Sequence, residues 1–508
     1  MGYNRRSFLK SAGAGVAGLT AASSLESLAP AATGGDDRPN ILFCLADDWG
    51  WPHAGVYGDE VVQTPTFDRL AREGVLFERC FVSSPSCSPC RNATLTGQQF
   101  YRLGQGANLH STLDVSHPNF MFMLREAGYA IGHHRKAWGP GDFRAGGYKQ
   151  HPCGPGMSFG EFMNKRPDDS PFCFWLGTSD PHRGYSGPGD VDTSKVEVPP
   201  FLPDVEEVRR DIASYYREVQ RWDSDVGRAV KMLEEAGELE NTIIVMTGDH
   251  GFPFPRGKGN LYDYGVRAPL AVRWGAEVQG GRRVSNLVSF TDFAPTFLDA
   301  AGVEVPDVMT GQSLVEVLTS GGEGRVEPAR DYIVYGRERH VPAQEDPWMV
   351  GYPSRAIRTD TWLYITNLEP QRWPAGVPEN ATHPSNEFAD CDDGPSKHFI
   401  MNHRNEEQYR RFYDLCFARR PAHELYDVEN DPVQMQNLAD DTAYHEVLQS
   451  LRNRLESYLR STEDPRFTDA PVKFDDYPYR AGYLDRDHLR KLRKERQEGK
   501  RTEPPFGS

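Results

Sequence analysis

The sequence predicts an α/β fold in which helices cover both faces of a large sheet. Three short apolar runs, rich in β-branched and aromatic residues, are typical of strands buried on both faces; they are residues 41–46, 172–176 and 242–246. Between the second and third runs, apolar residues recur at three- and four-residue spacing from Ile212 to Leu233, and Gly237 follows them. This alternation of strands and helices favours a sheet between helical layers.

Each of the three runs ends in a polar cluster. Asp47-Asp48 follows the first run, Asp180-Pro181-His182-Arg183 the second and Asp249-His250 the third. Ligands of such folds bind beyond the carboxyl ends of the strands, so we expect the three clusters to share one edge and to form a single site.

The length and charge of the chain limit its function. Its 508 residues allow one large α/β domain and a smaller one. The net charge of −16 argues against a nucleic acid partner, whose binding rests on basic surface. An anionic substrate would instead need a few local cations and a metal inside an acidic shell. No run after the N-terminus is long and apolar enough to span a bilayer, so we expect no membrane partner.

The chain divides into four predicted segments. Residues 1–32 contain the twin-arginine pattern Arg5-Arg6, a weakly apolar run and small residues suited to cleavage, which indicate export to the periplasm or the extracellular space. A Gly-rich linker at 320–324 separates a catalytic domain, 38–325, from a smaller α+β subdomain, 326–484. The subdomain has short strand patterns at 332–335 and 356–365, and a turn and helix within 424–459. Residues 485–508 form a charged tail.

The eight cysteines are too few for a disulfide scaffold. Cys44 and Cys173 lie in apolar runs and should be buried, whereas Cys391 and Cys416 could pair. Cys87 and Cys90 form a C-x-x-C pair that would suit a redox dithiol or half a zinc site, but the chain has no second such pair and no compact thioredoxin-like βαβ unit around it.

The residues from Cys87 to Gly97 carry the strongest chemical signal. The residues after Pro89 have helix-forming character, which places Cys87 just before a helix start, where free N–H groups and the helix dipole attract an anion. Arg91 adds a planar cation suited to an oxyanion. The carboxylates of Asp47, Asp48 and Asp249 would repel one another without a cation, and carboxylate ligands favour Ca²⁺ or Mg²⁺. A nucleophile beside an anion site fits sulfuryl or phosphoryl transfer.

The segment Cys87-Ser88-Pro89-Cys90-Arg91, closing with Leu95-Thr96-Gly97, resembles the signature of the type I sulfatases. The resemblance implies an alkaline-phosphatase-like α/β sandwich, with a large mixed sheet between helices and a smaller C-terminal α+β subdomain. It also implies that a formylglycine-generating enzyme oxidises Cys87 to formylglycine, whose hydrate attacks sulfur. The implied metal ligands are Asp47, Asp48, the modified Cys87, Asp249 and His250, with Ca²⁺ as the ion and Mg²⁺ or Mn²⁺ as alternatives.

The resemblance further assigns the groups that act on sulfate. The segment from Gly257 to Pro269 supplies Lys258, and Arg91 and Lys136 join it in neutralising the sulfuryl oxygens. His182 would protonate the leaving group or contact sulfate. Many family members have Asn where His250 stands; because imidazole is an unusual calcium ligand, His250 could instead donate a hydrogen bond to the substrate.

The chain departs from the family at one catalytic position. The family usually reads Gly-Lys-x-His where this chain has Arg135-Lys136-Ala137-Trp138, so Trp138 stands in the histidine position. The histidines that could replace the missing group are His133, His134 and His110.

The substrate is expected to be a sulfated glycan carrying an O-sulfate or an N-sulfate. Asp180-Pro181-His182-Arg183 and Phe252-Pro253-Phe254-Pro255 look most like the heparan N-sulfatase branch. Arg183 is a candidate for substrate binding. Arg337, Arg339 and His340 follow a strand pattern and either line a pocket for acidic sugars or form a solvated turn. The alternatives are a phosphonate or phosphodiester hydrolase of the same superfamily, and a non-catalytic glycan-binding relative.

Overall fold

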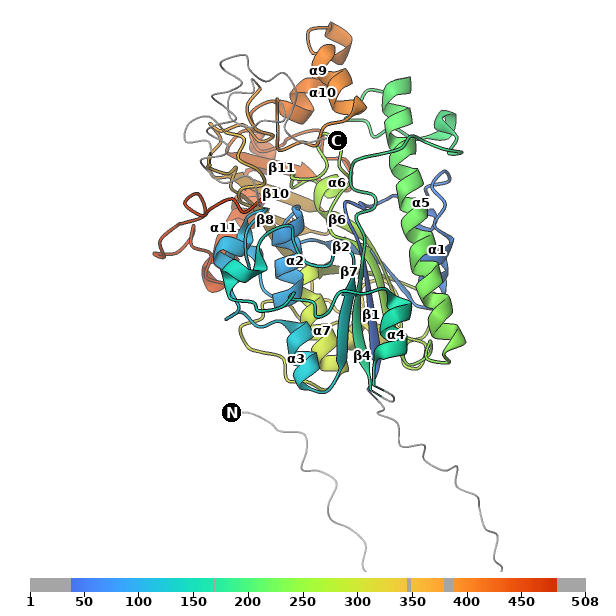
Figure 1. Ribbon diagram of the computed structural model, residues 1–508. Helices are drawn as coiled ribbons and strands as arrows, with labels where there is room; N and C mark the ends of the chain where they lie inside the picture. The colour runs from blue at the N-terminus through green and yellow to red at the C-terminus, as the bar shows by residue number, and fades with distance from the viewer. Residues whose placement is uncertain (1–37, 168–169, 345–348, 379–386, 482–508) are drawn as a thin grey trace, which may run out of the picture. The chain divides into compact units, whose positions relative to one another are not determined.

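A seven-stranded sheet forms the centre of the fold (Figure 1). The computed structural model describes residues 38–167, 170–344, 349–378 and 387–481, which belong to one compact unit. The strand order is β3-β4-β1-β5-β6-β2-β7. The strands are β1 (Asn40–Ala46), β2 (Val75–Phe81), β3 (Ala130–His134), β4 (Phe172–Gly177), β5 (Thr242–Gly248), β6 (Arg267–Arg273) and β7 (Arg282–Ser289).

The three predicted buried strands are neighbours at the middle of this sheet. β1 lies between β4 and β5 and is parallel to both, with Phe43 opposite Trp175 on one side and Val245 on the other. β6 runs antiparallel to β5 and β2, so the sheet is mixed, as predicted. Because β1, β4 and β5 are parallel, their carboxyl ends meet at one edge of the sheet, the upper edge in Figure 1.

Helices cover both faces of the sheet. Alternate residues of β1 point to opposite faces, so each helical layer packs against one set of them. Phe43 packs against Trp175 and Phe297 on one face, and Leu42 and Cys44 belong to the core of the other. The first face carries α2 (Cys87–Thr96), α3 (Phe120–Glu126), α7 (Phe293–Ala300) and α8 (Val315–Thr319). The second carries α1 (Pro65–Glu73), α4 (Phe159–Lys165) and α5 (Glu206–Glu235).

The predicted amphipathic helix is α5. Its buried stripe contains Ile212, Val219, Val226 and Leu233, and Gly237 follows with φ +71°, a conformation that glycine adopts without strain. The remaining short elements are α6 (Asp263–Val266) and the 3₁₀ turns Gly55–Tyr57, Phe100–Ala107, Phe143–Gly146, Thr193–Lys195, Phe290–Asp292 and Thr442–Tyr444.

A second, antiparallel sheet follows in the C-terminal part, in the order β11-β10-β9-β8. Its strands are β8 (Tyr332–Arg337), β9 (Ser354–Thr359), β10 (Trp362–Asn367) and β11 (His423–Asp427), and its helices are α9 (Pro395–Asn402), α10 (Glu407–Phe417) and α11 (His445–Ser461). The pattern predicted at 356–365 covers two strands, because the chain reverses at Asp360 and pairs Leu363 with Arg358.

The predicted linker is attached to the large sheet. The amide of Gly324 donates to the Arg283 oxygen at 2.8 Å, and its oxygen accepts from the Ser285 amide at 2.8 Å. The segment therefore extends the β7 edge by one bridge. The domain boundary after residue 325 stays a prediction.

Two predicted segments, the signal at 1–32 and the tail at 485–508, lie outside the described residues. Within the part of the chain that the structure describes, no helix combines the length and apolar character needed to cross a bilayer. All eight cysteines are free and buried, which confirms Cys44 and Cys173 as core residues. The possible Cys391–Cys416 disulfide is not formed; Cys416 Sγ points to the Phe201 oxygen and Cys391 Sγ to the Asp392 oxygen.

Candidate active site

The three polar clusters meet at the carboxyl edge of the sheet, as predicted. The Asp47 amide donates to the Asp180 oxygen at 3.0 Å, which joins the turns after β1 and β4. The Asp48 amide donates to Asp249 Oδ1 at 2.9 Å, which joins the turns after β1 and β5. The parallel order of the three strands thus brings Asp48 and Asp249, which are 201 positions apart, into contact.

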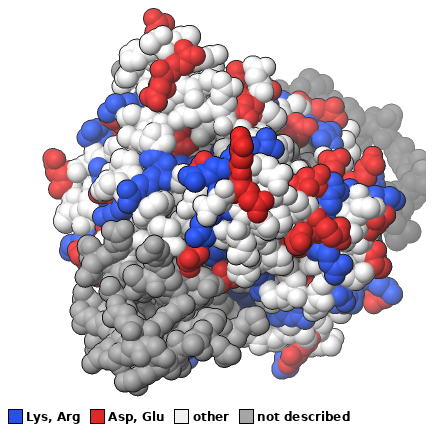
Figure 2. Space-filling view, turned by 90° about the horizontal axis from the view of Figure 1, so that it is seen from above, with Lys and Arg blue, Asp and Glu red and all other residues white. Residues whose placement is uncertain are grey.

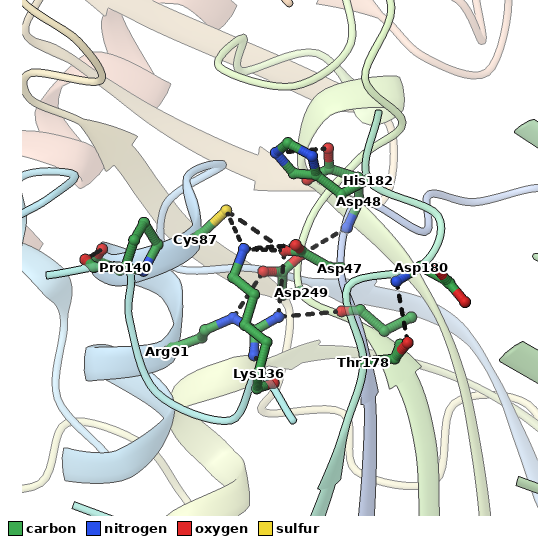
Figure 3. A network of polar contacts seen from close by, with 12 residues as sticks. Asp47, Asp48, Cys87, Arg91, Lys136, Pro140, Thr178, Asp180, His182 and Asp249 are labelled. Carbon is green, nitrogen blue, oxygen red and sulfur yellow. Dashed lines mark hydrogen bonds and ion pairs between the residues drawn. The ribbon is translucent and has the colours of Figure 1, made fainter. Parts of the chain in front are cut away.

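Cys87 is the first residue of α2, with Ser86 as the N-cap, so the helix begins one residue earlier than expected. Pro89 is tolerated because N–H groups of a first helical turn have no intrahelical partner. Gly97 ends the helix with φ +64°. The whole helix is buried, and its positive end faces the carboxylates of the sheet edge (Figure 3).

The Cys87 side chain lies at the centre of the group and is 2% exposed. Its Sγ is 3.5 Å from Asp47 Oδ1 and 3.4 Å from Lys136 Nζ (Figure 3). It is also 3.4 Å from His250 Nε2. Burial raises the pKa of the thiol; the charge of Lys136 opposes this effect, and the Asp47 and Asp249 carboxylates add to it, so the pKa stays above its ordinary value. An unmodified Cys87 is therefore a protonated thiol and a poor nucleophile at neutral pH.

The residues around Cys87 fit a divalent cation. Ligand atoms of Asp47, Asp48, Cys87 and His250 all lie within 4.8 Å of one another. Asp48 Oδ1 is buried and accepts no hydrogen bond from the described residues, although His250 Nε2 lies 3.3 Å from it. Burial of an unpaired carboxylate oxygen costs free energy unless a cation or a protonated imidazole faces it. Asp249 stands outside this group, because its Oδ1 accepts from the Asp48 amide and its Oδ2 from Arg91. Its role as a ligand stays a prediction.

Arg91 holds two of these carboxylates in place. Its guanidinium is fully buried and donates to Asp249 Oδ2 at 2.9 Å and to Asp47 Oδ1 at 3.3 Å. Its remaining donors face the backbone oxygens of Lys136 and Ala137, each at 2.8 Å. Arg91 therefore ties the start of α2 to the carboxylates and to the segment that carries Lys136.

Two lysines each contact one carboxylate of this group. Lys136 Nζ is 2.5 Å from Asp47 Oδ2, and Lys258 Nζ is 2.9 Å from Asp48 Oδ2. Burial would lower the pKa of each lysine, but the carboxylates raise the pKa of Lys136 and raise that of Lys258 well above its usual range. Burial likewise opposes ionisation of Asp47, yet Lys136, His182 and Arg91 hold the pKa of Asp47 well below its ordinary value. Both lysines are thus fixed cations beside Cys87.

His182 lies above this group (Figure 3). Its side chain is 38% exposed and its Nε2 is 4.0 Å from Asp48 Oδ2. The neighbouring Arg183 turns away: it donates to both oxygens of Asp211, at 2.8 and 2.9 Å, and to the Pro253 oxygen at 2.7 Å.

Of the three predicted subdomain residues, only His340 contacts the segment around Cys87 directly, with Nδ1 2.8 Å from Ser86 Oγ. Arg337 donates to Asp390 at 2.7 Å and to the oxygens of Pro374 and Gly259, the residue after Lys258. Arg339 donates to the Met349 and Tyr477 oxygens. Both arginines are buried, so the alternative of a solvated turn is wrong, and protein acceptors occupy their Nη donors.

Trp138 occupies its position as a packing residue, with Nε1 2.6 Å from Asn92 Oδ1 on α2. His133 stacks on His151 at 3.8 Å and contacts the Gly154 oxygen. His110 differs, because burial and the charges of Lys136 and Lys258 lower its pKa to about 4. The replacement of the missing group by one of these histidines stays a prediction.

Asp392 belongs to the site and was missed from the sequence. Its Oδ2 is 3.0 Å from Lys258 Nζ. Burial opposes ionisation of Asp392, but Lys258 and His182 hold its pKa below the ordinary value. No strand end or motif precedes it, and 134 residues separate it from Lys258, so no local pattern could have identified it.

The face above the sheet edge carries many cations. Figure 2 shows Lys and Arg side chains gathered across the middle of this face, beside Asp and Glu side chains. Cationic and acidic side chains therefore share this face.

Comparisons with known proteins agree with this geometry. Residues 39–155 and 157–303 match the Sulfatase family, and residues 248–366 match the family described as N-sulphoglucosamine sulphohydrolase, C-terminal. The human N-sulphoglucosamine sulphohydrolase is 30% identical over 496 residues, covering 84% of this chain and 91% of the human protein. An ulvan-active sulfatase from Formosa agariphila is 28% identical over 491 residues, covering 84% of this chain and 76% of that protein.

A solved structure shares the fold. A protein in complex with its substrate D-glucosamine-2-N,6-O-disulfate superposes with a TM-score of 0.60 at 20% identity, covering 84% of this chain and 98% of that chain. The chain belongs to the sulfatase family. It is a hydrolase of sulfate groups, either a sulfuric ester hydrolase or a sulfamidase, and it is similar to the sulfamidase branch.

Proposed function

We propose that this protein removes O-sulfate or N-sulfate groups from sulfated glycans, with a nucleophile derived from Cys87 and a divalent metal. The observation that carries the proposal is the position of Cys87 Sγ at the start of α2, within 3.5 Å of Asp47, His250 and Lys136. The human relative and the glycan-active relatives support a sulfated carbohydrate as the substrate.

Asp47, Asp48 and His250 would hold the metal together with the modified Cys87, and Asp249, whose Oδ1 is 3.4 Å from His250 Nε2, would be a further ligand. The family's ion would polarise the nucleophile and neutralise sulfuryl oxygens. Ca²⁺ suits the carboxylates, whereas the His250 imidazole also suits Mn²⁺. Formylglycine, made from Cys87 by a formylglycine-generating enzyme, would supply the attacking hydroxyl.

The cations of the site divide into two roles. Lys136 and Lys258 present ammonium groups beside Cys87 and would stabilise charge on the sulfuryl oxygens. Arg91 donates its hydrogen bonds to Asp47, Asp249 and backbone oxygens, which supports a positioning role. The partly exposed His182 would protonate the leaving group.

Export fits this function. A twin-arginine signal carries folded proteins, so metal loading and oxidation of Cys87 would precede export to the periplasm or the extracellular space. Retention of an uncleaved chain in the cytoplasm of its bacterial host would contradict this part of the proposal.

The test is release of inorganic sulfate by protein produced together with a formylglycine-generating enzyme. The substrates are N-sulfated glucosamine, O-sulfated glucosamine and a phosphonate monoester. We expect sulfate from at least one sugar, loss of release with a chelator and recovery with Ca²⁺ or Mn²⁺. Turnover of the phosphonate alone would favour the alternative hydrolase, and silence on all three would favour the non-catalytic alternative.

A further inference from the structure

Asp392 is an acidic residue in a site otherwise built to hold an anion. Its Oδ2 is 3.0 Å from Lys258 Nζ, and Lys258 also contacts Asp48. A carboxylate oxygen of Asp392 and a ring nitrogen of His182 belong to one group with Asp48, with all three atoms within 4.8 Å of one another. Asp392 therefore lies beside the residue proposed as the acid for the leaving group.

The protein fixes the segment that carries Asp392 from one side through Asp211. This carboxylate accepts from Arg183 and also from the amide and the hydroxyl of Ser396, at 3.1 and 2.7 Å. The Arg183 guanidinium lies so close to Gly394 that a Cβ there would be 2.3 Å from Arg183 Nη1. Arg183 thus acts on the site through Gly394 and Ser396 as a positioning residue.

The other side of the segment is fixed by Lys397, which is 2% exposed. Its Nζ donates to the Cys391 oxygen at 2.9 Å and to the Phe388 oxygen at 3.2 Å. A buried lysine costs free energy unless its donors are satisfied, so this arrangement holds Phe388 and Cys391, the residue that directly precedes Asp392, in place. Rigid support of this kind is what a recognition group needs.

The chemistry of a carboxylate limits what Asp392 can recognise. It accepts hydrogen bonds and repels sulfate oxygens, so it must face the part of the substrate that departs. When an S–N bond breaks, the sulfuryl group passes to the attacking oxygen, the electron pair stays on nitrogen, and the nitrogen takes a proton. The departing amine then offers N–H donors. When an S–O bond breaks, the pair stays on oxygen, which also takes a proton and leaves as a neutral alcohol with a single O–H donor. The amine leaves with two N–H donors and can take a further proton to become an ammonium, which the Asp392 carboxylate attracts.

We propose that Asp392 is a specificity-determining residue that recognises the departing amine and so favours N-sulfated over O-sulfated sugars. This inference rests on the proposed function and names its substrate class.

The first test compares kcat/KM for N-sulfated glucosamine and glucosamine 6-sulfate in the wild type, Asp392→Asn and the matched control Asp393→Asn. Asp393 lies on the same segment and its carboxylate faces Lys397 at 2.8 Å instead of Lys258. We expect Asp392→Asn to lower kcat/KM about 10- to 100-fold for the N-sulfate and about threefold or less for the O-sulfate. The larger loss corresponds to the usual contribution of a hydrogen bond to a charged group. The control should keep the wild-type ratio. Equal losses on both substrates would overturn the proposal, because Asp392 would then only hold Lys258.

The second test measures binding without catalysis. Calorimetric titration of Cys87→Ala protein should show tighter binding of glucosamine than of N-acetylglucosamine, and Asp392→Asn in that background should remove the difference. Glucosamine binding that is unchanged by Asp392→Asn would overturn the proposal. Because this readout needs neither formylglycine nor turnover, it decides the role of Asp392 even if the wild type releases no sulfate and the proposed function fails.

Discussion

Replacement of Arg91 by methionine tests whether the carboxylate group is built for a cation. Without metal, the Arg91→Met variant leaves Asp47 and Asp249 buried without their guanidinium partner, and it leaves the Lys136 and Ala137 oxygens without donors. Removing one partner of a buried ion pair costs about 3–5 kcal/mol, and with two carboxylates affected we expect about 5 kcal/mol.

A bound cation should reduce this loss of unfolding free energy. Saturating Ca²⁺ would compensate the two carboxylates and leave only the two unpaired oxygens, so we expect a loss of about 2 kcal/mol. The assay is urea unfolding of the wild type and the variant, with chelator and with Ca²⁺. Arg282→Met is the matched control. Buried Arg282 donates to the Gly322, Leu318 and Val317 oxygens and, among the described residues, to no carboxylate.

The control should lose the same free energy of unfolding with and without Ca²⁺. If Arg91→Met also loses the same amount in both conditions, the carboxylate group does not bind the cation and the reasoning fails.

Two further predictions concern charge. Lys136→Met should lower kcat about 10²- to 10³-fold, as loss of one oxyanion-stabilising donor does, while the circular dichroism spectrum is unchanged; kcat within threefold of the wild type would contradict the role of Lys136. Burial lowers the pKa of His53 to about 4, so the unfolded chain binds a proton there below its ordinary pKa of about 6.5 while the folded protein does not. Stability should therefore fall by up to about 3 kcal/mol as the pH drops from 6.5 to 4, and His53→Gln should make the fall in the unfolding midpoint shallower; an identical slope in both proteins would refute this assignment.

The sequence predicted the site residues that stand at strand ends and at the start of a helix, because local patterns mark these places. Apolar runs ending in Asp47, His182 and Asp249 predict strand ends, and parallel strands must present those ends at one edge. Cys87 was predicted from its own segment, because a helix start is a local feature.

The remaining features depend on contacts between distant segments. Arg337 and Arg339 were predicted to bind the substrate because they are charged. Their Nη groups instead donate to backbone oxygens, and no sequence pattern indicates such contacts. Asp392 reaches the site only because Asp211 and Lys397 fix its segment, a relation that no spacing records. The turn at Asp360 was missed for a different reason. The residues on both sides of it are apolar, so the sequence shows one strand pattern where the structure has two paired strands.

The central claim is that Cys87 supplies the nucleophile for sulfate cleavage. The most direct measurement is sulfate release by metal-loaded wild type, Cys87→Ala and Cys90→Ala, all produced with the same formylglycine-generating enzyme. Cys90 is the matched control, since it is a buried cysteine three residues further along α2. The account predicts release by the wild type and Cys90→Ala and none by Cys87→Ala. Sulfate release by Cys87→Ala at the wild-type rate would contradict it.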